Sequence, residues 1–212
     1  MKTFAIVPVK GFQNGKTRLS SLFNLDERML LSSFMLDYTL NVLGSVPSIS
    51  LVAVVSTDKC AEEIAAKHRA KFLREEKENG VNSAVALADR HCIQEHADAT
   101  IVIPYDLPLL DAVDISRACE LAQNEARCVV ICPSLRYDGT NMLLRKPPSV
   151  ISTFYDTDSY NMHIKSAIRL GVRVKHLLSK TVMYDIDTPD DARRLAKEPG
   201  DSKTLRFLRS KY

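Results

Sequence analysis

The stretch FAIVPVKGFQNGKTRL, residues 4–19, decides the fold. Its first part, Phe4 to Val9, is a continuous apolar run that is too short for a buried helix, so it predicts a central strand covered on both faces. Two glycines and three cations follow, and there backbone amides and positive charges can converge on one anion. The stretch therefore predicts a strand that leads into a phosphate-binding loop, with Lys10, Gly11, Gly15, Lys16 and Arg18 around the anion.

This loop is not a Walker A motif, although it contains Gly-Lys-Thr. That motif needs four residues between its first glycine and the Gly-Lys-Thr. Only three residues separate Gly11 from Gly15, and Lys10 stands where the motif requires glycine. We therefore interpret the loop as a different strand-loop nucleotide site, and a solvated turn with scattered lysines is the alternative.

Length and composition favour one domain that binds a small anion. The chain has 212 residues, 45% of them hydrophobic, and no linker-like stretch divides it. Its 29 basic and 26 acidic residues are dispersed and give a net charge of +3, which does not predict a nucleic-acid partner. No apolar run approaches the ~18 residues of a membrane span or the core of a signal peptide. We expect a cytoplasmic protein without a membrane partner.

The cysteines do not predict a metal site. They form no C-x-x-C pair, and no histidines follow at zinc-finger spacing. Free, mostly buried thiols in a reducing compartment are the expectation. The residues concerned are Cys60, Cys92, Cys119, Cys128 and Cys132.

Apolar runs and helical segments alternate along the rest of the chain. Further strands are predicted over residues 51–56, 71–73, 100–104, 127–133, 140–144, 172–177 and 182–186. Helices are predicted over residues 26–44, 58–68, 82–96, 111–124 and 159–170, and a last one begins at Pro189. This alternation indicates an α/β fold with a largely parallel sheet between two helical layers, in which ligands bind at the carboxyl ends of the strands.

Three carboxylates follow predicted strands. Asp106 comes after the strand TIVIP, and Asp185 and Asp187 come after the strand TVMY. Carboxylates that face a cationic loop are typical of a magnesium site, because this ion takes hard oxygen ligands together with substrate phosphates. The alternatives are a turn before Pro108 for Asp106 and a helix start at Pro189 for Asp187.

Three polar segments add candidate binding groups. Gly80 and Asn82 begin a helix and could contact a base edge or a phosphate. Thr140 and Asn141 enter a strand and offer uncharged donors to a carboxylate or phosphate. Ser159 opens another helix, where it either binds a second anion or only caps the helix.

With these pieces in order, the chain resembles the 2-phospho-L-lactate guanylyltransferases, archaeal enzymes of coenzyme F-420 biosynthesis. The resemblance covers almost the whole chain. It implies a three-layer α/β/α, Rossmann-like nucleotidyltransferase fold with a mostly parallel mixed sheet, like that of molybdopterin guanylyltransferases. It also implies Mg²⁺, GTP as donor and 2-phospholactate as acceptor. The motifs that carry it are VPVK, GKTRLS, GVNSA, PYDLPLL, DGTNMLL, SYNMH and YDIDTPDDA.

The resemblance also implies roles for single residues. Lys16 and Arg18 would hold the triphosphate and, with Asp106, serve catalysis; Lys10, Gly11, Gly80 and Asn82 would lie by the nucleotide. Asp106 would bind magnesium, with Asp187 as a second ligand. Thr140, Asn141 and Ser159 would bind the acceptor, and His163 either orients it or is structural. Family members commonly have glycine three residues before the serine, where this chain has Asp156, so only the Asp156 backbone is expected to bind.

The implied reaction needs no general base. An acceptor phosphate, mostly dianionic at neutral pH, attacks the α-phosphorus of GTP and pyrophosphate leaves. Phosphoenolpyruvate and 3-phosphoglycerate are alternative acceptors. A glycosyltransferase that uses the D-x-D of Asp185 to Asp187, and a GTP-binding module without turnover, are alternative functions.

The last residues raise the question of assembly. We divide the chain into a domain over residues 1–198 and a tail over residues 199–212. Leu205, Phe207 and Leu208 are too large and apolar for a tail of this length to bury alone. They predict either a homodimer interface or packing on the chain's own sheet.

Overall fold

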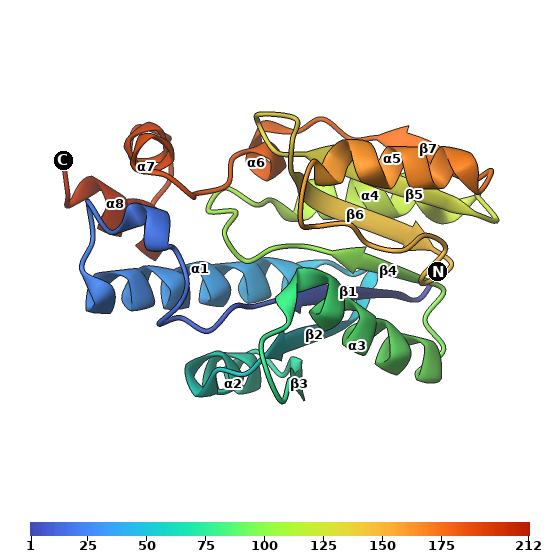
Figure 1. The fold of residues 1–212 in the computed structure, drawn as a ribbon, viewed down its shortest axis with the longest axis horizontal. Helices are drawn as coiled ribbons and strands as arrows, with labels where there is room; N and C mark the ends of the chain where they lie inside the picture. The colour runs from blue at the N-terminus through green and yellow to red at the C-terminus, as the bar shows by residue number, and fades with distance from the viewer.

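The computed structural model describes residues 1–212 and contains a seven-stranded sheet with helices on both faces (Figure 1). The strands are β1 (Thr3–Pro8), β2 (Ile49–Ser56), β3 (Lys71–Arg74), β4 (Ala99–Val102), β5 (Cys128–Pro133), β6 (Thr140–Lys146) and β7 (Arg173–His176). The helices are η1 (Thr17–Leu19), α1 (Leu25–Ser45), α2 (Lys59–Lys67), α3 (Gly80–Gln94), α4 (Ala112–Gln123), α5 (Ser159–Arg169), α6 (Lys180–Met183), α7 (Pro189–Leu195) and α8 (Lys203–Arg209).

The sheet is mixed and mostly parallel, as the sequence predicts. Its order is β3-β2-β1-β4-β6-β5-β7. β1 pairs in parallel with β2 and β4, whereas β6 runs antiparallel to both of its neighbours, β4 and β5. Because β6 is reversed, its first residues lie at the edge of the sheet where β4 and β5 end.

The two faces of the sheet carry two apolar cores. Ala5 and Val7 of β1 face the larger core, to which α1, α2 and α4 contribute, whereas Phe4 and Ile6 face the core under α3 and α5. All six residues of β1 are buried, which confirms a central strand covered on both faces. The three-layer α/β/α architecture is thereby confirmed.

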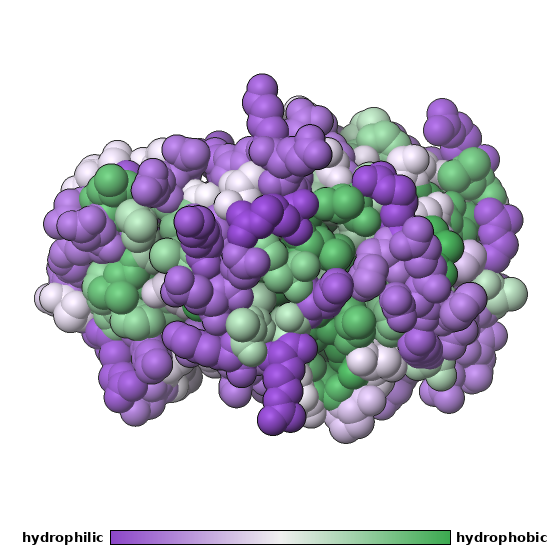
Figure 2. Space-filling model, turned by 90° about the horizontal axis from the view of Figure 1, so that it is seen from below, coloured by the Kyte–Doolittle hydropathy of each residue, from purple (hydrophilic) through white to green (hydrophobic).

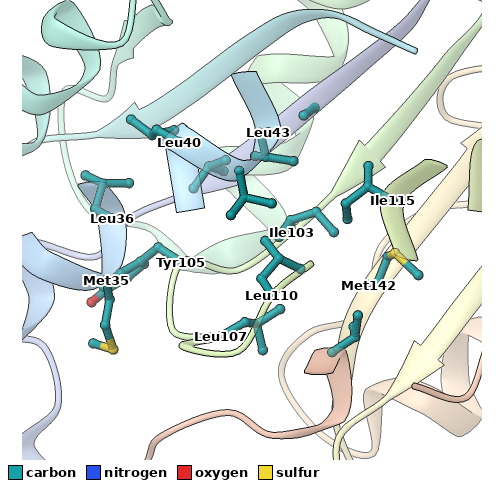
Figure 3. Packing of buried hydrophobic residues seen from close by; sticks show 14 of the residues in the cluster. Met35, Leu36, Leu40, Leu43, Ile103, Tyr105, Leu107, Leu110, Ile115 and Met142 are labelled. Atoms are coloured by element: carbon teal, nitrogen blue, oxygen red, sulfur yellow. The ribbon is translucent and has the colours of Figure 1, made fainter. Parts of the chain in front are cut away.

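The larger core fixes the segment that follows β4. Tyr105 and Leu107 are buried against α1, and the same packing includes Leu36 and Leu40 from that helix (Figure 3). A buried residue on each side of Asp106 leaves its side chain in a defined position at the carboxyl end of β4.

The predicted strand over residues 182–186 is wrong. The chain forms the short helix α6 there, and an irregular segment with Asp185 and Asp187 follows it. The buried residues Val182, Met183 and Ile186 recur at helical spacing, so the apolar run satisfies a helix as well as a strand. Asn24 caps α1, where Asn24 and Glu27 form a reciprocal capping box.

The C-terminal helix α8 packs on its own chain. Leu205 and Leu208 are buried, and the Phe207 ring lies between Phe23 and Phe34, with centroids 5.5 and 6.0 Å apart. The red end of the chain in Figure 1 accordingly lies beside the start of α1. The tail belongs to the domain core, so its apolar side chains give no reason for a dimer, and the homodimer stays a prediction.

The edges of the sheet are short and charged. β3 and β7 each have four residues, and Lys71, Arg74 and Arg173 are exposed on them, which discourages pairing with another sheet.

The surface is mostly hydrophilic on the face seen from below, where hydrophilic side chains surround several small hydrophobic areas (Figure 2).

The thiols are free, as predicted: four of the five cysteines are buried and Cys60 is exposed. None of the helices combines the length and the apolar composition that crossing a lipid bilayer requires.

Candidate functional site

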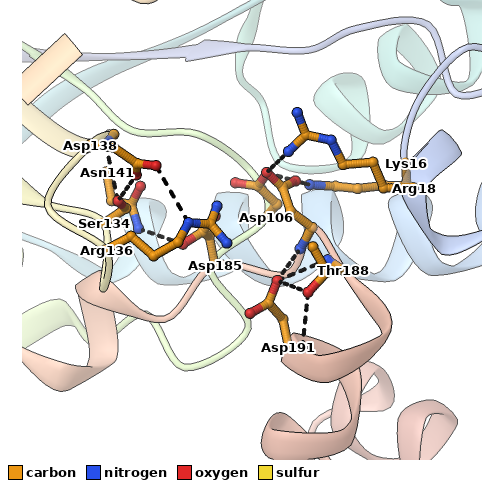
Figure 4. Close-up of polar contacts among 12 residues, drawn as sticks. Lys16, Arg18, Asp106, Ser134, Arg136, Asp138, Asn141, Asp185, Thr188 and Asp191 are labelled. Atoms are coloured by element: carbon orange, nitrogen blue, oxygen red, sulfur yellow. Dashed lines mark hydrogen bonds and ion pairs between the residues drawn. The ribbon is translucent and has the colours of Figure 1, made fainter. Parts of the chain in front are cut away.

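A polar cavity of about 360 Å³ opens at the carboxyl ends of β1 and β4. The loop after β1, the segment after β4, the β5–β6 loop with the start of β6, and the segment after α6 all contribute to its wall (Figure 4). The cavity therefore lies at the edge of the sheet where the sequence predicts a ligand. Charged lining residues are Lys10, Lys16, Asp106, Arg136, Asp138, Asp185 and Asp187.

One lysine joins two of the predicted carboxylates. The Lys16 ammonium donates hydrogen bonds to Asp106 and, over 2.8 Å, to Asp187. The backbone of Lys16 is left-handed, with φ of 52°, a conformation that costs non-glycine residues free energy and is concentrated at functional sites. A hydrogen bond of 3.2 Å from Ile186 N to Asp106 O ties the two carboxylate segments together. Arg18 lies at the rim, 71% exposed and 3.9 Å from Asp187.

The electrostatics of these groups reflect an excess of negative charge. Burial works against a charged Lys16, but Asp106 and Asp187 outweigh it and raise the pKa of the lysine. Burial likewise opposes the charged form of Asp187, and Lys16 outweighs it and lowers the pKa of that carboxyl. The third carboxyl, that of Asp185, has no cationic partner. Burial, followed by the charge of Asp106, raises the pKa of Asp185 to about 6.

The carboxylates could hold a divalent cation with help from a substrate. Asp106 and Asp187 already share one cationic group, the Lys16 ammonium, so their oxygens converge on a common position. No group of three or more histidine, cysteine or acidic side chains is arranged to enclose a metal by itself. Two hard oxygen ligands that leave other positions to phosphates suit Mg²⁺, which usually binds in this way. Magnesium at this point stays a prediction.

The raised pKa of Asp185 predicts an effect on stability. The folded value of about 6 exceeds the reference of 3.8, so the folded protein binds more protons than the unfolded chain between these values. The charge of Asp185 thus lowers stability as pH rises through this window, fully so above pH ~6. Asp185→Asn should raise the free energy of unfolding by about 1–3 kcal/mol at pH 7 in metal-free protein.

Thermal melts with EDTA at pH 7.5 and pH 4 check this expectation. The stabilisation should be present at pH 7.5 and nearly absent at pH 4. Asp190→Asn removes an exposed carboxylate nearby and should change little at either pH. An Asp185→Asn variant that is less stable than the unmodified protein at pH 7.5 would show that the carboxylate is already compensated.

The predicted acceptor residues Thr140, Ser159 and His163 lie together. The Ser159 hydroxyl donates to Thr140 Oγ1 over 3.1 Å, and His163 Nδ1 lies 3.0 Å from the same oxygen. All three residues are buried, and Thr140 and Ser159 line the cavity. Asp158 rather than Ser159 occupies the N-cap position of α5, so the alternative that Ser159 only caps the helix does not hold.

Two predicted binding amides are engaged within the protein. The Asn82 side chain accepts from Tyr155 N and donates to Asp156 Oδ2, both over 2.9 Å, so it holds the loop before α5 against α3. Asp156 points to this amide and does not line the cavity, as expected of a carboxylate near an anion site. The Asn141 amide donates to Val182 O and to Asp185 Oδ1 and thereby positions the segment after α6. Ligand contacts by Asn82 and Asn141 stay predictions.

The loop after β1 also binds anionic groups, but these are the protein's own carboxylates. Gly11 N donates to Glu78, and Phe12 N donates to Asp58 Oδ2 over 2.8 Å. A phosphate would have to displace Glu78 to reach the Gly11 amide. Beside this loop lies a second cavity of about 340 Å³, which shares Pro8, Lys10 and Val81 with the first and is also lined by Val9, Glu75, Glu78, Gly80 and Ala84.

Sequence reasoning missed several lining residues. Arg136 of the β5–β6 loop faces Asp138 and contributes to the low pKa of Asp187. The sequence could have predicted Arg136 as a lining residue, since it is a basic residue just before the Asp-Gly-Thr-Asn segment that enters a predicted strand. Tyr105 and Tyr155 also line the cavity; Tyr105 directly precedes the predicted ligand Asp106, whereas no neighbouring motif indicated Tyr155.

Comparisons with known proteins find similar sequences over nearly the whole chain. Residues 3–211 match the family described as guanylyl transferase CofC like. The chain is 34% identical to a phosphoenolpyruvate guanylyltransferase of Rubrobacter xylanophilus, over 94% of this chain and 96% of that one. It is 31% identical to a 2-phospho-L-lactate guanylyltransferase of Methanothermobacter thermautotrophicus (99% and 91% covered). It is 30% identical to a 3-phospho-D-glycerate guanylyltransferase of Colwellia psychrerythraea (92% of each).

Solved structures share the fold at much lower identity. A protein of Desulfovibrio desulfuricans G20, provisionally described as a nucleotide-diphospho-sugar transferase, superposes with a TM-score of 0.79 at 17% identity, over 99% of this chain and 95% of that one. A nucleotidyl transferase of Methanothermobacter thermautotrophicus gives a TM-score of 0.65 at 13% identity, over 99% of both chains.

Proposed function

Because the chain belongs to the family of CofC-like guanylyl transferases and is thus a nucleotidyltransferase, we propose that it transfers GMP from GTP to a phosphorylated three-carbon acid. We propose (2S)-2-phospholactate as this acid, which gives (2S)-lactyl-2-diphospho-5'-guanosine. The phospholactate assignment rests on the ordered motifs of the chain, since the relatives carry three different acceptor names.

One observation carries the proposal: a single cavity combines two sets of groups. Lys16, Asp106 and Asp187 line the cavity and suit a triphosphate with its counterion. Thr140 and Ser159 line the same cavity, and the Thr140 hydroxyl, whose oxygen accepts from Ser159, suits the smaller acceptor anion. Two anions that must react with each other can thus occupy one space.

The chemistry requires positioning and charge cancellation. A phosphate oxygen of the acceptor forms a bond to the α-phosphorus of GTP while the bond from that phosphorus to the bridging oxygen breaks, and the electron pair leaves with pyrophosphate. Lys16, Arg18 and Lys10 would neutralise the donor phosphates, which lowers the repulsion between the two anions. Mg²⁺ held by Asp106 and Asp187 would supply further stabilisation of charge on the phosphoryl oxygens.

The second cavity suits the guanine base. It adjoins the first at Lys10, has apolar walls, and contains Glu75 and Glu78. Guanine presents two neighbouring donors, N1–H and the 2-amino group, and a carboxylate accepts from both, whereas adenine presents an acceptor at N1. Burial and the charge of Glu78 raise the pKa of Glu75. A ligand that donates hydrogen bonds to Glu75 and Glu78 would stabilise the charged forms of both carboxylates.

A product assay tests the function. The purified protein is incubated with Mg²⁺, with GTP or ATP, and with phospholactate, phosphoenolpyruvate or 3-phosphoglycerate; products are identified by mass and pyrophosphate is measured. We expect the guanylated diphosphate and equimolar pyrophosphate from GTP and phospholactate. A preference for another acceptor would contradict the choice of phospholactate and leave the proposed transfer of GMP standing. Absence of pyrophosphate with all pairs, or release of a nucleoside diphosphate from a sugar nucleotide, would reject the proposed function.

A further inference from the structure

His163 is buried and held in one protonation state. Its Nε2 accepts a hydrogen bond of 2.9 Å from Phe154 N, which can only donate. Burial, followed by the charge of Arg145, lowers the pKa of His163 to about 4, so the ring is neutral at neutral pH. A neutral imidazole carries one N–H, and because Nε2 is an acceptor here, the proton lies on Nδ1.

This tautomer determines what Thr140 can do. His163 Nδ1–H lies 3.0 Å from Thr140 Oγ1 and can only donate to it. The Ser159 hydroxyl donates to the same oxygen over 3.1 Å. A hydroxyl oxygen accepts two hydrogen bonds and donates one. With both acceptor positions filled, Thr140 keeps only its own O–H proton for a further partner, and it lines the cavity where such a partner would bind.

We propose that His163 is a positioning residue that makes Thr140 an obligatory hydrogen-bond donor to the anionic acceptor substrate. The inference rests on the proposed function, because it concerns the acceptor side of the same cavity. A free threonine hydroxyl can accept as well as donate, so it binds neutral and anionic groups alike. Once its oxygen is filled by His163 and Ser159, Thr140 favours the phosphate or carboxylate of a phosphorylated acid. His163 itself contacts no substrate.

A structural role for His163 has to be separated from this one. The ring also lies against Phe154 and Tyr155, with centroids 5.9 and 5.1 Å away, and supports the backbone of that loop through Nε2. The two nitrogens can be replaced one at a time. Asparagine can place an amide N–H near the position of Nδ1, whereas glutamine can place a carbonyl oxygen near the position of Nε2.

The experiment compares His163→Asn with His163→Gln in the full chain. For each variant, KM for the acceptor, KM for GTP and kcat are measured, and acceptor binding is measured by calorimetry. We expect His163→Gln to weaken acceptor binding by about tenfold to a hundredfold, the range for a hydrogen bond to a charged group, with KM for GTP unchanged. His163→Asn should restore most of the acceptor affinity.

Other outcomes overturn the proposal. If Gln preserves the acceptor affinity and Asn loses it, support of the Phe154 loop is the role of the ring. Equal loss in both variants, an equal rise of both KM values, or failure of both to fold assigns His163 to the core. If the unmodified protein binds none of the three acids in the same calorimeter, the proposed function fails, which is a separate result from any difference between the variants.

Discussion

Asp106→Asn is expected to lower kcat at least about a hundredfold, which corresponds to a few kcal/mol of transition-state stabilisation. Asparagine keeps the shape of the side chain but removes one of the two charges that converge on Lys16 and on the proposed magnesium position. Because Tyr105 and Leu107 anchor the segment in the core, the backbone should remain in place. Pyrophosphate release under saturating GTP and acceptor measures the effect.

A matched control and a magnesium titration sharpen this test. Asp190→Asn removes an equal charge from α7, where Asp190 is exposed and pairs only with Arg193 on the same helix, and should leave kcat near normal. If Asp106 binds the ion, the variant should also require more Mg²⁺ for half-maximal rate. Near-normal turnover of Asp106→Asn at ordinary magnesium would remove Asp106 from the metal site.

The sequence located the site because local pattern determines where strands end. Asp106 lies a few residues after the short apolar strand β4, and the loop with Gly11 and Gly15 follows β1, so their meeting at the carboxyl edge of the sheet follows from the parallel order. Asp187 also lies at the cavity, although a helix and not the predicted strand precedes it. The Asn141 amide donates to Val182 O and to Asp185 Oδ1, and these hydrogen bonds hold the segment before Asp187 beside the cavity.

The contacts that the sequence could not predict are long-range and depend on tertiary packing. Glu78 binds the Gly11 amide from 67 residues away, and Asn82 binds the loop at Tyr155 from 73 residues away. The hydrophobic periodicity of a sequence does not predict which distant residues form such pairs. A polar residue near a predicted site also gives the same sequence pattern whether its hydrogen-bonding groups are free for a ligand or already bound within the protein. The reversal of β6, which brings Thr140 to the cavity, is likewise a property of the assembled sheet.

A buried ion pair beneath the sheet provides a second large effect, on stability. Arg145 of β6 is 1% exposed and donates to both oxygens of Asp89 on α3, over 2.8 and 2.6 Å. Thr100 accepts from Arg145 and Ser149 donates to Asp89, so the pair is part of a connected network. Removal of either partner leaves a buried charge without its counterion, which typically costs about 3–5 kcal/mol.

Asp89→Leu and Arg145→Met should therefore each lower the melting temperature by roughly 6–20 °C, given ~2–4 °C per kcal/mol for a chain of this size. The double variant should be more stable than either single variant, because two apolar side chains leave no unpaired charge in the core under α3. Thermal and urea unfolding of the four proteins closes the cycle. Neither residue lines the cavity, so folded protein at low temperature should retain normal turnover. Additive losses in the double variant would mean that the two charges contribute to stability independently, through the Thr100 and Ser149 contacts and not through each other.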